Sequence, residues 1–329
     1  MHTVLTLASF LLSICGCSLI LTRLSSPIDW SKRRSMQMLL LAAPLISLGF
    51  SAGELCLQMA PTWDTFLDLT FFLVMAGSVV AALGLNLMRL TLLTRFLARQ
   101  RGVPDTVLQT SVDLLARQRG VTSPRLLVCQ ANQPLALTYG LFRPTILLST
   151  WMRDRLDRRE LEAVLAHELE HVARHDFLII WLATILRDAF CYLPTSRKAY
   201  ERLHREKELA CDDVVVRTTR RPLALASALT KIWLHAVEEP QPAPQLSLSM
   251  AQPAQSLAGA GESLKERIER LLVSGDSPSP DVPPPFSASP LSIIASVISM
   301  PLVPLLLHAV SITLLILLMR CDLSHLLIL

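Results

Sequence analysis

Four long apolar stretches constrain what this 329-residue chain can fold into. They run from 4 to 22, 36 to 60, 67 to 88 and 291 to 319. A helix needs roughly 20 such residues to cross a hydrocarbon core about 30 Å thick. Hydrophobic residues make up 51% of the chain and charged residues only 18%, which excludes a purely soluble globular protein. We therefore expect a mainly α integral membrane protein with three early spans and one late span, and a lipid bilayer as its first partner.

The first apolar stretch has the length of a retained helix, but a signal peptide is the alternative. No lysine or arginine precedes this stretch and no Ala-x-Ala cleavage site follows it, so we expect the helix to be retained. A lipoprotein modified at Cys17 is expected even less. The seven cysteines are irregularly spaced, and we expect them to be reduced thiols rather than a disulfide framework.

Basic residues in the short loops give the expected orientation, because cytoplasmic loops are rich in Lys and Arg. The loop between the first two stretches carries Arg23, Lys32, Arg33 and Arg34, whereas the segment 61–66 carries only Asp64. Arginines also follow the third stretch, at 89, 95, 99 and 101. These clusters place the region from about 95 to 289 in the cytoplasm of a multi-pass inner-membrane protein.

The same arginines do not indicate a nucleic-acid partner. The net charge is only +4 and aromatic residues make up 5% of the chain, so neither a strongly basic surface nor a stacking platform is evident. Membrane topology and anionic lipid already explain the basic residues beside the spans. We expect no direct contact with nucleic acid.

The cytoplasmic region begins with a helix and a small sheet. Apolar residues recur at helical spacing between 105 and 119, and Gly120 is a helix stop. Three short apolar runs, 125–129, 136–139 and 145–149, are separated by Asn, Pro and Gly and are typical of strands. A further helix is predicted from Asp157 through His175. This alternation predicts an α+β domain over about 95–239.

The segment from 240 to 290 has the composition of a linker. It holds ten of the 21 prolines in the chain, together with many Ser and Ala, and cannot bury a core of its own. Within it, 262–273 (ESLKERIERLLV) places Leu264, Ile268, Leu271 and Leu272 on one stripe opposite charged residues. We expect a short amphipathic helix that either docks on the domain or lies on the bilayer surface.

The segment AHELEHVARHD contains the pattern H-E-x-x-H at His167, Glu168 and His171. Residues four apart lie on one helix face, about 5 to 6 Å apart, so both imidazoles can bind one Zn²⁺. Glu168 lies beside them and can accept a proton from a zinc-bound water, acting as the general base of peptide hydrolysis. The alternative is a polar helix face on which two histidines occur by chance, since short motifs recur in unrelated chains.

A catalytic zinc site needs a third protein ligand and an open fourth position. Glu208, in the segment REKELACDD, is the leading candidate, and Asp212 lies on the same helical face four residues later. Asp212 could accept an N–H from a ligand histidine and so fix its tautomer. Other candidates for the third ligand remain open on spacing alone: His175, His204, Glu206 and Asp213. We expect His175 to be a capping or packing residue instead.

The apolar run 177–193 tests this ligand set, because a complete membrane crossing there would separate Glu208 from the histidines. The run is short and interrupted by Arg187 and Asp188. We therefore expect a core or interfacial helix that returns the chain to the site, ending at Pro194.

AHELEHVARHD followed by RxxHREKELACDD resembles the cytoplasmic metallopeptidase domain of the BlaR/MecR-type antirepressor peptidases. The stretch QPLALTYGLFRPTILLS resembles the segment of that family before the zinc helix, and SLKERIERLL resembles its Leu-Lys-x-Arg-Ile element after it. The resemblance implies a zincin-like (gluzincin) metallopeptidase domain. It implies His167, His171 and Glu208 as zinc ligands and Glu168 as the general base.

The resemblance also bears on the activity that we expect of the protein. Only residues 320–329 follow the last predicted span, so we do not expect the extracellular penicillin-binding domain that senses beta-lactams. We expect a zinc-dependent endopeptidase with a regulatory role, and membrane-protein quality control is the enzymatic alternative. A non-catalytic signalling or scaffold protein is the alternative of another class. A transporter finds little support, because the predicted spans carry few charges and show no paired inverted halves.

The expected partner is a protein or peptide substrate, for example a transcriptional repressor, a membrane-protein tail or the chain's own linker between 239 and 289. Metallopeptidases often bind substrate as an additional strand, and 145–149 (TILLS) is the candidate edge, with an ordinary core strand as the equal alternative. Tyr139, Tyr200 and Arg205 are candidates for stabilising an oxyanion, and none of them is favoured.

Overall fold

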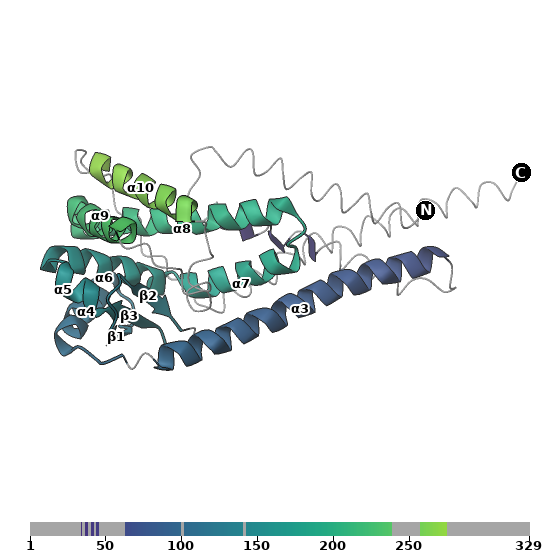
Figure 1. Ribbon diagram of the computed structural model, residues 1–329, viewed down its shortest axis with the longest axis horizontal. Coiled ribbons are helices and arrows are strands. Elements are labelled where there is room, and N and C mark those ends of the chain that lie inside the picture. Colours follow the sequence, from purple (N-terminus) through teal and green to yellow (C-terminus); the bar gives the residue numbers. More distant parts are fainter. Residues whose placement is uncertain are drawn as a thin grey trace, which may run out of the picture. The chain divides into compact units, whose positions relative to one another are not determined.

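A computed structural model describes residues 63–99, 102–140, 143–238 and 257–274, together with positions 34, 37, 38, 41, 42, 44 and 45 (Figure 1). The chain forms two compact units. The first comprises 1–84, 183–203 and 290–329, and the second comprises 85–182 and 204–289. The described part is mainly helical, with one small mixed sheet in the second unit.

The long helix α3 (Trp63–Arg99) contains the one candidate membrane span among the described residues. Phe72–Leu97 is long and apolar enough to cross a bilayer by length and composition, and only 17% of that stretch is buried. The predicted span 67–88 falls on this helix, which continues without a break as far as Arg99. The predicted spans 4–22 and 291–319, and most of 36–60, lie outside the described residues.

Helices α7 (Asp176–Ala189) and α8 (Pro194–Thr219) are joined by a short turn. The turn and the adjoining helix ends belong to the first unit, where the Tyr192 hydroxyl lies 2.7 Å from Met75 Sδ of α3. The expected helix end at Pro194 is wrong, because α7 already ends at Ala189 and Pro194 begins α8. Proline suits the first turn of a helix, where its missing N–H has no helical partner to lose.

The sheet of the second unit has the order β1-β3-β2. Its strands β1 (Arg125–Cys129), β2 (Ala136–Tyr139) and β3 (Thr145–Ser149) have the predicted bounds. β3 pairs in parallel with β1 and antiparallel with β2. β3 is therefore the central strand and all five of its residues are buried. The hypothesis that TILLS offers an edge to substrate is wrong, and the core-strand alternative is correct.

Helix α4 (Thr106–Arg119) has the predicted bounds, with Asp105 as N-cap and Gly120 ending it at φ 69°. Helix α5 (Thr150–Arg155) follows β3 directly. Helix α6 (Arg158–Ala173) starts at a capping box formed by Asp157 and Glu160. Apolar residues of these helices and of the sheet form one core, which includes Val112, Leu126, Ile146, Leu148, Met152, Leu161, Val164 and Leu165.

Helix α6 ends two residues earlier than predicted. His175, expected inside the helix end, has a φ of 53° and separates α6 from α7. Its N–H donates to the Val172 carbonyl, and its own carbonyl accepts from the N–H groups of Leu178 and Ile179 at the start of α7. The capping role expected for His175 is therefore confirmed.

Helices α9 (Pro222–Glu238) and α10 (Leu257–Ser274) pack together in the second unit. A second core joins them to α6 and α8 through Ala163, Ala166, Val215, Leu225, Ala226, Leu229 and Leu271, with Leu264 and Ile268 packed against it. α10 is longer than the predicted helix 262–273 and docks on the domain. Leu272, assigned to the apolar stripe, is half exposed.

Candidate metal centre

Helix α6 presents the H-E-x-x-H residues on its buried side. His167 and Glu168 are buried, and so are the apolar residues on either side of them, Ala166 and Leu169. The helical spacing brings the two imidazoles together, with 3.2 Å between His167 Nε2 and His171 Nε2. The rings meet edge to face, so both Nε2 atoms approach one point.

Helix α8 brings Glu208 to the same point. Glu208 Oε2 lies 3.3 Å from His167 Nε2, and Oε1 lies 3.8 Å from His171 Nε2. These three residues could hold a metal ion, because one ligand atom from each lies within 4.8 Å of the others. Since two residues are on α6 and the third is on α8, the segment between them returns the chain to the site, as the predicted ligand set requires.

Each imidazole has a carboxylate at its other ring nitrogen. His167 Nδ1 lies 3.0 Å from Asp212 Oδ1, and His171 Nδ1 lies 2.8 Å from Asp176 Oδ2. A carboxylate at Nδ1 favours the tautomer whose Nε2 lone pair is available to a metal. The sequence indicated the position of Asp212, but it did not indicate Asp176, which begins the next helix.

A second group, formed by His171, Asp176 and Cys211, could also hold an ion. It uses the opposite ring nitrogen of His171, with Cys211 Sγ 3.2 Å from Nδ1. Burial raises the pKa of the Cys211 thiol well above its usual range. The group of His167, His171 and Glu208 is the better site, because a metal bound there leaves the contacts of both Nδ1 atoms with Asp212 and Asp176 in place.

Buried cations keep the carboxylates of the centre charged. Burial raises the pKa of Glu208, but Lys207 and Arg267 outweigh that effect and hold this pKa well below its usual range. Lys207 Nζ lies 2.9 Å from Glu208 Oε1, and Arg267 Nη1 lies 3.1 Å from Glu208 Oε2. Burial lowers the pKa of His167, yet Asp212 and Glu208 raise it to about 9, so a metal ion that binds Nε2 has to displace a proton from this imidazole. Two imidazoles and an anionic carboxylate are a donor set that suits a divalent transition metal.

Strand β2 holds Glu168 in place. Thr138 Oγ1 lies 2.8 Å from Glu168 Oε2 and 3.2 Å from the Glu168 carbonyl oxygen. The hydroxyl has one proton, so the carboxylate is the stronger acceptor for it. Nothing in the sequence pattern indicated this contact, because Thr138 lies thirty residues before Glu168 in the chain.

The other candidate ligands (His175, His204, Glu206 and Asp213) and the candidates for oxyanion stabilisation (Tyr139, Tyr200 and Arg205) have different places. None of them belongs to the metal-binding group of His167, His171 and Glu208 found among the described residues. Asp213 pairs with Arg270, Arg205 pairs with Glu266, and Tyr200 lies in the first unit near Thr184. Tyr139 is the last residue of β2, and His204 is buried on α8.

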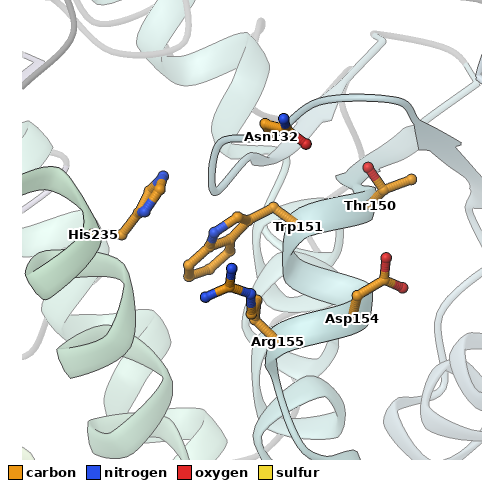
Figure 2. Close-up of a pocket in the computed structure, with 6 residues that line it drawn as sticks. All are labelled: Asn132, Thr150, Trp151, Asp154, Arg155 and His235. Carbon is orange, nitrogen blue, oxygen red and sulfur yellow. The ribbon is translucent and has the colours of Figure 1, made fainter. Parts of the chain in front are cut away.

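A pocket lies elsewhere on the second unit (Figure 2). Its lining residues come from α5, α9 and the turn after β1: Asn132, Thr150, Trp151, Asp154, Arg155 and His235. The Trp151 and His235 rings lie 4.8 Å apart. No residue of the metal centre lines this pocket, so it adds nothing to the chemistry of the site.

Comparison of the chain with known proteins identifies a family and several relatives. Residues 4–271 match the family model described as BlaR1 peptidase M56. Three curated relatives bear the name Protease HtpX homolog. Those from Streptomyces coelicolor, Salinibacter ruber and Pyrococcus abyssi are 31%, 26% and 28% identical over 156, 166 and 156 residues. These matches cover 37%, 42% and 37% of the chain and 51%, 60% and 54% of the relatives.

The chain thus spans little more than half the length of these relatives, whereas the family model extends over most of the chain and includes all the residues of the metal centre. The chain belongs to the BlaR1 peptidase M56 family.

Proposed function

We propose that the protein is an integral-membrane, zinc-dependent endopeptidase that cleaves a cytoplasmic or membrane-associated protein. His167, His171 and Glu208 bind the zinc ion and Glu168 is the general base. The observation that carries the proposal is the convergence of three ligand atoms on a helix face that also carries the buried Glu168 carboxylate. A purely structural metal site has no need of that carboxylate.

Bound zinc would polarise the peptide carbonyl and lower the pKa of a water molecule. Glu168 accepts the proton of that water and delivers it to the leaving amine. Thr138 holds the Glu168 carboxylate through its hydroxyl. Asp212 and Asp176 hold the two imidazoles so that Nε2 of each faces Glu208.

Strand β2 is the better candidate for binding a substrate strand. Ser149 N donates to the Leu135 carbonyl, so alternation along the antiparallel ladder turns the backbone groups of Leu137 and Tyr139 toward β3. The backbone groups of Ala136 and Thr138 then face the outer edge. Because Thr138 also contacts Glu168, an extended peptide added at this edge would lie beside the general base.

The expected role is regulatory, through cleavage of a repressor or of the chain's own linker between 239 and 289. Membership of the BlaR1 peptidase M56 family supports a peptidase role. The relatives named Protease HtpX homolog favour a protease and name no substrate, so membrane-protein quality control is the second enzymatic candidate. The candidate span in α3 supports a membrane location, with the second unit on the cytoplasmic side.

Metal analysis of the full chain purified in detergent tests the ligand set. We expect one zinc per chain in the wild type and in Glu168→Gln, and loss of zinc in Glu208→Ala and His171→Ala. Full retention of zinc in Glu208→Ala would contradict the ligand assignment. An absence of zinc in the wild type would favour the non-catalytic signalling or scaffold protein.

Mass spectrometry tests self-cleavage. We expect fragments ending between 239 and 289 in the wild type and an intact linker in Glu168→Gln. An intact linker in both proteins would exclude self-cleavage and leave a separate substrate.

A further inference from the structure

Arg267 differs from the other charged residues of α10. The side chains of Lys265, Glu269 and Arg270 are 70%, 64% and 47% exposed, whereas that of Arg267 is 11% exposed. A buried guanidinium requires compensating partners, because an unpaired charge is costly to remove from water. Its partners therefore indicate why it is buried.

Those partners all belong to the metal centre. Arg267 Nε lies 2.7 Å from Asp212 Oδ2, and Nη2 lies 2.8 Å from Asp212 Oδ1. The third nitrogen, Nη1, lies 3.1 Å from Glu208 Oε2. One guanidinium thus contacts the proposed zinc ligand on α8 and the carboxylate that holds His167.

We propose that Arg267 is a positioning residue, which fixes the Asp212 and Glu208 carboxylates in the orientation that zinc binding requires. The inference rests on the zinc site proposed above. It adds a residue from α10 to a centre whose three proposed ligands lie on α6 and α8.

Arg267 fixes the orientation of the Asp212 carboxylate through a two-point contact. Two parallel N–H···O contacts fix the plane of a carboxylate, which a single contact does not. With this plane fixed, Oδ1 remains 3.0 Å from His167 Nδ1. Arg267 therefore acts on the His167 ring through Asp212, and its Nη2 also lies 3.5 Å from His167 Nε2 itself.

Arg267 also compensates the repulsion between the Glu208 and Asp212 carboxylates. Glu208 and Asp212 are four residues apart on one face of α8, and like charges at this spacing repel each other. Arg267 lies against both carboxylates, whereas Lys207 contacts only Glu208. A neutral residue at 267 would leave Asp212 without its two-point partner and would leave the repulsion uncompensated.

Two other roles predict different results. If Arg267 only anchors α10 to α8, its loss should resemble the loss of Arg270, which joins the same two helices through Asp213. If the guanidinium competes with the metal for Glu208 Oε2 and His167 Nε2, which lie 3.1 and 3.5 Å from it, its loss should strengthen metal binding. Arg270→Gln is therefore the matched control for the anchoring role. A weaker Zn²⁺ affinity in Arg267→Gln would exclude the role in which Arg267 competes with the metal.

The test compares the full-length wild type with Arg267→Gln, Arg267→Lys and Arg270→Gln. Zn²⁺ affinity is measured by competition with a chromophoric chelator, and ligand geometry by the visible spectrum of the Co²⁺-loaded protein. We expect Arg267→Gln to weaken Zn²⁺ binding by about 10- to 100-fold and to change the Co²⁺ spectrum, because loss of a group that orients metal ligands has effects of this size. The Zn²⁺ affinity of Arg267→Lys should lie between those of the wild type and Arg267→Gln. Arg270→Gln should match the wild type in both affinity and spectrum.

Wild-type affinity and spectrum in Arg267→Gln, equal losses in Arg267→Gln and Arg270→Gln, or tighter binding in Arg267→Gln would overturn the inference. If Arg267→Gln does not fold, Arg267→Lys decides, since it keeps the charge and removes the two-point contact; an unchanged Co²⁺ spectrum would then count against positioning. His171→Ala separates the two proposals. Zinc retained in that variant refutes the ligand set, whereas zinc lost there and unaffected by Arg267 refutes only the role of Arg267.

Discussion

At the scale of single residues, the metal centre depends on groups that bind no metal. Asp212 and Asp176 contact the Nδ1 atoms of the two histidines, and Thr138 contacts Glu168. The H-E-x-x-H spacing predicted the histidines and Glu168, because that geometry is local to one helix. Asp176, Thr138 and Arg267 lie on other elements, and only the folded chain brings them to the site.

Replacing Asp176 with asparagine should weaken zinc binding by about tenfold or more. The amide is neutral and no longer favours the His171 tautomer with an available Nε2 lone pair, and changes of this kind typically cost 10- to 100-fold in affinity. Chelator competition measures the effect. Asp154→Asn is the matched control, because the Asp154 side chain is 59% exposed and lies away from the centre. Equal affinities in all three proteins would show that Asp176 does not orient His171.

Thr138→Val should lower peptidase activity by about tenfold and leave the zinc content unchanged. The substitution removes a hydrogen bond to a charged carboxylate, an interaction of about 1.5 to 3 kcal/mol, while keeping the shape of the side chain. Hydrolysis of an unfolded protein such as casein measures the activity, with Glu168→Gln as baseline. Thr138→Ser restores the hydroxyl and should recover most of the rate. Unchanged activity in Thr138→Val would mean that Glu168 does not need this contact.

At the scale of elements, local punctuation predicted the bounds of all three strands and of α4. Strand order could not be predicted in the same way, because it depends on pairing between distant segments. The apolar run TILLS was therefore compatible with an edge strand and with a core strand, and only the structure shows that β3 is central. The prediction that Pro194 ends a helix was wrong, because proline is also common in the first turn of a helix, and Pro194 begins α8.

If β2 binds substrate, Ala136→Pro should reduce peptide cleavage at least tenfold without loss of zinc. Proline removes the N–H that faces the outer edge of β2 and leaves the contacts of Leu137 with β3 in place. Cleavage of a quenched fluorescent peptide and metal analysis provide the two measurements. Ala136→Val, which keeps the N–H, is the control. Equal cleavage by the proline and valine variants would exclude this edge as the binding strand.

The start of α6 is fixed to α9 by Glu160. This buried carboxylate accepts from Ser227 Oγ, from Lys231 Nζ and from the Asp157 N–H at 2.6, 2.6 and 2.8 Å. Burial raises the pKa of Glu160, but Lys231 and Ser227 lower it by more, so its pKa lies below the usual 4.5. The charged Glu160 carboxylate therefore stabilises the fold fully above pH 4.5, the usual pKa of the unfolded chain. This stabilisation is lost as the pH falls through the lower pKa of Glu160 in the folded state.

Glu160→Gln should lower the free energy of unfolding at pH 7 by about 1 to 3 kcal/mol, because it weakens a buried hydrogen bond to a charged group. The difference from the wild type should shrink as the pH falls below 4.5. Thermal unfolding in detergent at pH 7, 5 and 4 measures it. Glu162→Gln, at a more exposed position of the same helix, controls for loss of charge. A difference that grows on acidification would contradict the role of the charged carboxylate.

At the scale of the whole molecule, the order of elements along the chain bears on topology. α7 and α8 leave the second unit and return to it, since His171 and Glu208 both belong to that unit. The segment between the ligands therefore cannot make a single complete crossing of a membrane. From this return and the arginines that follow the third apolar stretch, we expect one location for the whole metal centre, in the cytoplasm.

Single-cysteine labelling tests that topology. Asp154→Cys, at an exposed position of α5, should react with a membrane-impermeant maleimide only after cells are opened. Asp64→Cys, in the segment predicted to face outward, should react in intact cells. Both variants are made in a background without other reactive cysteines, and zinc content verifies that the site has survived. Labelling of Asp154→Cys in intact cells would place the metal centre outside. The substrate would then be an external protein, and the basic clusters at 23–34 and 89–101 would need an explanation other than the positive-inside rule.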